Sequence, residues 1–112
     1  MQLLLFFLKK TELMETLLKT LAQNNLTGGT ILDAKGLASG LSQMEDELPM
    51  IWSLRKYLEA SIKSETKLLI MAIKDEDVIR VADLIKSVVG DLSEPNSGVL
   101  LTLPVMYCEG IL

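Results

Sequence analysis

Two continuous apolar runs constrain most strongly what this chain can fold into. Residues 3–8 read Leu-Leu-Leu-Phe-Phe-Leu, and residues 68–73 read Leu-Leu-Ile-Met-Ala-Ile. Each run has the length of a strand and is too short for a typical helix. Neither can span a bilayer, which needs about 20 apolar residues in a helix, so we do not expect a membrane protein. The runs therefore predict strands over 2–8 and 66–74, each with two apolar faces.

Two other segments show the spacing of amphipathic helices. Apolar residues recur every three or four positions over 11–23, where Thr11 is the expected N-cap. The same spacing over 78–89 follows an acidic start, with Asp75 or Asp77 as the cap and Gly90 as the stop. The sequence therefore predicts one helix after each apolar run.

Shorter extended segments complete the pattern. Residues 30–35 lie between glycines and contain β-branched residues, and they predict a strand, as do residues 99–105. The connection between the strands at 30–35 and 66–74 is long, and we expect a short helix within it over 49–60. A bent extended segment is the alternative there, because apolar residues also alternate near its end.

The predicted order is strand, helix, strand, long connection, strand, helix, strand. This is the α+β, ferredoxin-like βαββαβ sandwich, here a single domain over 1–112, with its first and third strands in the sheet centre. One layer of helices covers only one face of a sheet, yet both faces of the central strands are apolar. We therefore expect copies of the chain to pack sheet against sheet.

Composition excludes several classes of function. The 112 residues carry a net charge of −4 and no basic block longer than two residues, which argues against a nucleic-acid partner. There is no histidine, and no nucleophile with a nearby base is evident, so we expect neither an enzyme nor a metal site. The acidic runs 45–47 and 75–77 are interpreted as a solvated loop and a helix start. Cys108 is the only cysteine, which indicates a reducing, cytoplasmic location.

Two short motifs resemble those of one family. Residues 28–36, Gly-Gly-Thr-Ile-Leu-Asp-Ala-Lys-Gly, resemble the second strand of the P-II nitrogen regulatory proteins. Residues 103–105, Leu-Pro-Val, resemble the end of the fourth strand in that family. The order of the predicted elements agrees with the family over nearly the whole chain. The resemblance implies a non-enzymatic homotrimer that senses a small molecule, classically an adenine nucleotide, in clefts between subunits.

The resemblance also assigns candidate residues. Thr30, Gly36 and Gly98 match positions that line the nucleotide cleft of the family. Residues 37–65 correspond to the T-loop, through which P-II proteins control a transporter, an enzyme or a transcription regulator. Within this segment Trp52, Arg55 and Tyr57 are candidates for contact with that unknown target; the alternative for the two aromatic residues is packing on their own domain.

Departures from the family pattern bear on the ligand. Val99 stands where the family has a phosphate-binding lysine, and Gly110 and Leu112 stand where it has arginines. Residues 38–40 are Ala-Ser-Gly in place of Gly-Arg-Gln. We therefore expect ATP to bind weakly or not at all. The alternative function is a trimeric adaptor without a ligand, including the copper-tolerance type of trimer with a similar fold.

Overall fold

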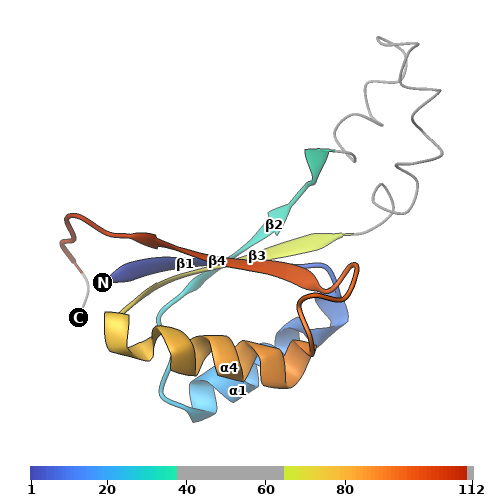
Figure 1. The fold of residues 1–112 in the computed structure, drawn as a ribbon, viewed down its shortest axis with the longest axis horizontal. Helices are drawn as coiled ribbons and strands as arrows, with labels where there is room; N and C mark the ends of the chain where they lie inside the picture. Colours follow the sequence, from blue (N-terminus) through green and yellow to red (C-terminus); the bar gives the residue numbers. More distant parts are fainter. Residues whose placement is uncertain (38–64, 111–112) are drawn as a thin grey trace, which may run out of the picture.

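The fold is an antiparallel sheet with helices on one side. The computed structural model describes residues 1–37 and 65–110. In chain order these residues form β1 (Gln2–Leu8), α1 (Met14–Gln23), β2 (Thr30–Ala34), β3 (Thr66–Ile73), α4 (Val78–Val89) and β4 (Gly98–Pro104). The strands lie in the order β2-β3-β1-β4, and every neighbouring pair is antiparallel (Figure 1). This α+β arrangement is compatible with a small ferredoxin-like domain, and it has the expected pair of strands in its centre.

The hydrophobic core fills the space between the sheet and the two helices. Alternate residues of β1 point into it, and Leu4, Phe6 and Leu8 are all fully buried. The helices contribute residues at three- and four-residue steps, the spacing that brings side chains to one face of a helix. The other core members are Met14, Leu17, Leu21, Leu69, Met71, Ile73, Val81, Ile85 and Val89. Both helices thus use one apolar stripe, and both stripes cover the same face of the sheet (Figure 1).

The helix starts differ from the predicted caps. Thr11 begins a 3₁₀ turn, Thr11–Leu13, and α1 starts only at Met14 without a side-chain cap. The backbone closes this turn itself, since the Leu13 N–H donates to the Lys10 carbonyl at 2.9 Å. A second 3₁₀ turn, Asp75–Asp77, precedes α4 in the same way, and no carboxylate caps it. The predicted cap at Thr11 was therefore wrong, whereas Asp77, one of the two residues predicted to cap the second helix, does occupy the N-cap position of α4, although its side chain makes no capping hydrogen bond.

The helix ends agree better with the sequence. Gly90 follows α4 with a φ of 92°, in the region that favours glycine, and its N–H donates to the Lys86 carbonyl at 2.8 Å. After α1 the chain turns at Asn24 and Asn25, and Asn25 has a φ of 63°. The strands at 30–35, 66–74 and 99–105 were each placed within one residue of their observed bounds. The helix expected over 49–60 lies outside the described residues.

Candidate functional site

The face of the sheet that the helices leave free is apolar from edge to edge. Strand register places its side chains in three rows across the sheet. The first row joins Leu32, Leu68, Phe7 and Val99; the second joins Thr30, Ile70, Leu5 and Leu101; the third joins Ala72, Leu3 and Leu103. We call these residues the outer face. Ten of its eleven side chains are apolar.

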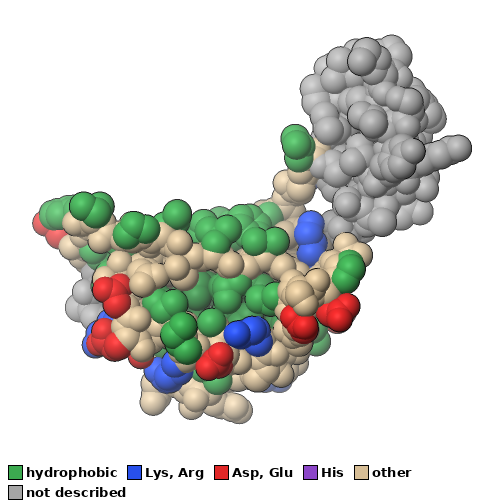
Figure 2. All heavy atoms as spheres, in the orientation of Figure 1, with side chains coloured by type: hydrophobic (Ala, Val, Ile, Leu, Met, Phe, Trp, Pro, Cys, Tyr) green, Lys and Arg blue, Asp and Glu red, His purple; other side chains and the backbone are tan. Residues whose placement is uncertain are grey.

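These side chains meet solvent in the single chain. At the two edges of the sheet, Leu32 is 47%, Val99 52% and Leu103 48% exposed, whereas the inward residues of β1 are fully buried. No described element covers them, and hydrophobic side chains line this side of the sheet in the space-filling view (Figure 2). Soluble monomers rarely leave so continuous an apolar surface in water. The outer face is therefore the strongest candidate for a functional surface.

The three predicted ligand residues lie far apart within one chain. Gly36 follows β2 and Gly98 begins β4, so these two residues lie at the same end of the sheet but on its opposite edges. Thr30 starts β2, about 20 Å from Gly36 at the usual rise of a strand. A single subunit therefore does not gather these residues around one ligand.

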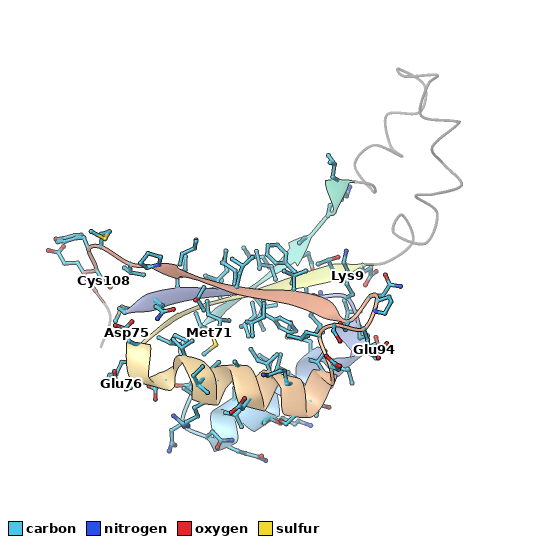
Figure 3. All side chains as sticks on the ribbon, viewed as in Figure 1. Lys9, Met71, Asp75, Glu76, Glu94 and Cys108 are labelled. Carbon is cyan, nitrogen blue, oxygen red and sulfur yellow. The ribbon has the colours of Figure 1, made fainter. Side chains whose placement is uncertain are left out.

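Gly36 has a basic neighbour. A side chain added at Gly36 would meet the Lys9 ammonium at 4.0 Å, and the same ammonium donates to the Thr66 hydroxyl at 3.3 Å. Lys9 lies at the end of the sheet where the connection between β2 and β3 departs (Figure 3). Lys9 thus places a positive charge close to a predicted ligand residue.

The packing of β4 against β1 requires a glycine at position 98. Its φ is 152°, and a Cβ atom there would lie 2.6 Å from the Phe7 carbonyl oxygen and 3.0 Å from the Phe6 ring. Real Cβ atoms do not come so close to backbone. The contact with β1 is therefore sufficient to require glycine at this position, with or without a ligand.

A cross-strand ion pair joins β2 to β3. Lys67 and Asp33 are cross-strand partners, and the Lys67 ammonium donates to the Asp33 carboxylate. This hydrogen bond, with the charge of Asp33, raises the pKa of Lys67 above its usual value. Because the pair is exposed to solvent, it contributes little to stability. It marks the point where the long connection leaves the sheet.

An open pocket on the helix side of the sheet was not predicted. It encloses about 210 Å³ between α1, the segment that follows α1, and strands β2 and β3. Its lining contains no charged side chain and consists of Leu18, Leu21, Ala22, Leu26, Thr27, Gly28, Gly29, Ile31, Leu69 and Met71. The sequence signal that points to it is a set of small residues, Ala22, Gly28 and Gly29, beside an apolar helix face. We call this cavity the α1–β2 pocket.

Other predicted residues lie outside the described part of the chain or carry no site. Trp52, Arg55 and Tyr57 belong to residues 38–64, which the structure does not describe. Cys108 is exposed. Among the described residues no cluster of histidine, cysteine or acidic side chains could hold a metal ion, and no helix is long and apolar enough to cross a membrane.

Comparison with known proteins gives no assignment. No protein-family model matches the chain, and no curated protein matches it either.

Proposed function

We propose that this chain is a non-enzymatic regulatory protein of the P-II nitrogen-regulator type that works as a cytoplasmic homotrimer. The observation that carries the proposal is the outer face, with ten apolar side chains in three cross-strand rows. Copies that pack outer face on outer face bury this surface and form a closed, symmetric assembly. The number of subunits comes from the resemblance of residues 28–36 and 103–105 to the P-II proteins.

The proposed ligand is a small molecule held in clefts between subunits. The positions of Gly36 and Gly98 on opposite edges of the sheet support a site built from two subunits, because the β2 edge of one copy can face the β4 edge of the next. Lys9 and Lys35 would then be the basic residues nearest to the ligand, since both lie beside the Gly36 end of β2.

ATP is not the ligand that we favour. Val99 is part of the apolar outer face and offers no charge where P-II proteins have a lysine, and the family's arginines are missing as well. Each charge-assisted contact with a phosphate contributes roughly 1.5–3 kcal/mol. Losing three of them removes most of the about 8 kcal/mol of a micromolar affinity. Calorimetry that finds low-micromolar ATP binding would contradict this expectation and would mean that Lys35 or Arg55 of a neighbour supplies the contacts.

Residues 37–65 are the proposed output element. They connect β2 to β3 beside the ligand end of the sheet, so a ligand in the cleft would act directly on the base of the connection. Trp52, Arg55 and Tyr57 are the residues that we propose to contact the target, a transporter, an enzyme or a transcription regulator.

The second candidate is a trimeric adaptor that needs no ligand, including the copper-tolerance type of trimer. The packing of Gly98 against Phe7 favours this candidate, because it explains the glycine without a ligand. Both candidates share the trimer and differ in whether a metabolite binds.

Thermal unfolding against a panel of nucleotides, other metabolites and divalent cations separates the two candidates. A ligand at 100 times its dissociation constant stabilises the folded protein by about 2.7 kcal/mol, which raises the melting temperature by several degrees. We expect at least one small metabolite to produce such a shift and ATP to produce little. If no compound of the panel shifts the transition, the adaptor is the better account.

A further inference from the structure

The α1–β2 pocket is a cavity that the proposed function does not use. Its floor is buried: Leu21 and Leu69 are each 2% exposed, and Met71 is 3% exposed and points from β3 toward the helices (Figure 3). Its rim meets solvent, with Leu18 36% and Ile31 39% exposed. Apolar side chains in such a place are stabilised when an apolar molecule covers them.

Two glycines leave part of the pocket wall as bare backbone. Gly29 passes close over the floor, since an added Cβ would lie 3.1 Å from the Met71 side chain and 3.3 Å from the Ile70 carbonyl oxygen. A Cβ at Gly28 would meet nothing within 4 Å, and its φ is not positive, so neither packing nor backbone requires a glycine there. None of the N–H groups of residues 27–29 donates to a backbone carbonyl of the described residues. This wall therefore offers hydrogen-bond donors to a bound molecule.

The size of the pocket and its surroundings favour a small molecule over a protein partner. On α1 the apolar surface ends at Ala22, because Lys19, one turn away, is exposed and pairs with Glu15 at 3.1 Å, and residues 23–25 are polar. A specific protein interface buries about 800 Å² of each partner, which this bounded surface does not offer. A dry cavity of about 150 Å³ holds benzene. The 210 Å³ of this pocket therefore suit a ring of that size with a short substituent.

We propose that the α1–β2 pocket binds a small, neutral molecule with an apolar body and one hydrogen-bonding oxygen, about eight heavy atoms in all. The body rests on the buried floor, and the oxygen faces Thr27, the one polar side chain of the lining, and the N–H groups of residues 27–29. A charged molecule is disfavoured, because the lining has no charged side chain to pair with it. The pocket lies within one subunit at the start of β2, whereas Gly36 follows the end of β2, so this site is separate from the proposed cleft between subunits.

Titration of the full chain with benzyl alcohol, followed by NMR of the backbone amides, tests this site. We expect saturable shifts at residues 27–29 and at Leu69 and Met71, with a dissociation constant of about 1 mM or tighter, within the usual efficiency of small ligands. Benzoate has the same ring with a charge and should bind at least tenfold more weakly. No saturable shift at these amides, shifts concentrated on the outer face, or equal binding of benzoate would overturn the proposal.

Three variants complete the design. Ala22→Leu fills the pocket from an exposed position of α1 where leucine suits a helix, and it should weaken benzyl alcohol binding at least tenfold. Ser87→Leu, on the exposed side of α4 and outside the lining, is the matched control and should bind within twofold of the unchanged chain. Thr27→Val keeps the shape without the hydroxyl and should weaken binding roughly two- to tenfold, the worth of one hydrogen bond. Equal affinities of Ala22→Leu and Ser87→Leu would overturn the site, and an unchanged affinity of Thr27→Val would overturn the placement of the oxygen.

Discussion

At the residue scale, Gly98 is the position where adding a single Cβ atom would disturb the packing most clearly. Its φ of 152° and the 2.6 Å approach of a Cβ to the Phe7 carbonyl leave no room for a side chain. We predict that Gly98→Ala destabilises the protein by about 1–3 kcal/mol, the usual range of such backbone strain. Gly28→Ala is the matched control, because nothing lies within 4 Å of its Cβ position, and it should change stability by about 0.5 kcal/mol or less. Equal denaturation midpoints for the two variants would contradict the packing account.

A second residue-scale prediction concerns Lys67. Asp33 raises the pKa of Lys67, so the pair favours the folded state at pH values below the ordinary pKa of 10.5. That contribution is lost as the pH rises through the raised pKa, where the folded protein gives up the proton. Asp33→Asn should therefore lower the Lys67 pKa toward its ordinary value, as NMR titration of the side chain can measure. An unchanged titration curve would mean that the pair does not form in solution.

At the element scale, the connection between β2 and β3 should be separable from the fold. Its two ends are held together by the sheet, because Ala34 and Thr66 are cross-strand partners. A chain that lacks residues 41–62 keeps nine residues, 35–40 and 63–65, between these partners, which is ample for a hairpin loop. We predict that this deletion leaves the number of subunits in the assembly unchanged and abolishes target binding. If the deletion variant is unfolded by circular dichroism, the segment belongs to the core and its regulatory role fails.

Elements were also the scale at which the sequence was most informative. The two apolar runs predicted both central strands correctly, because a short continuous apolar run is typical of a strand in the middle of a sheet and too short for a helix. The start of α4 at Val78 agrees with the prediction, whereas the start of α1 was missed because residues 11–13 form a 3₁₀ turn before the helix. The apolar spacing over 78–89 includes Ile79, yet this side chain is 71% exposed, because Val81 and Ile85 lie on the buried stripe of the helix. The α1–β2 pocket was missed although the small residues Ala22, Gly28 and Gly29 mark it, because its shape depends on how the segment after α1 packs against β2 and β3.

At the scale of the whole molecule, the proposed assembly depends on the outer face. Leu5 lies in the middle of this face, opposite Ile70 on one side and Leu101 on the other. A carboxylate at that point would be taken out of water in the assembly without a partner, which is strongly unfavourable. Leu5→Glu should therefore produce monomers. Ile79→Glu places the same charge on the opposite side of the subunit, where the side chain is exposed, and should leave the assembly intact.

Light scattering on the purified chain at micromolar concentration tests this central claim most directly. The account predicts a mass of about three times 12.4 kDa for the unchanged chain and for Ile79→Glu, and a single subunit for Leu5→Glu. A stable, soluble monomer of the unchanged chain would contradict both the burial of the outer face and the P-II-type assembly.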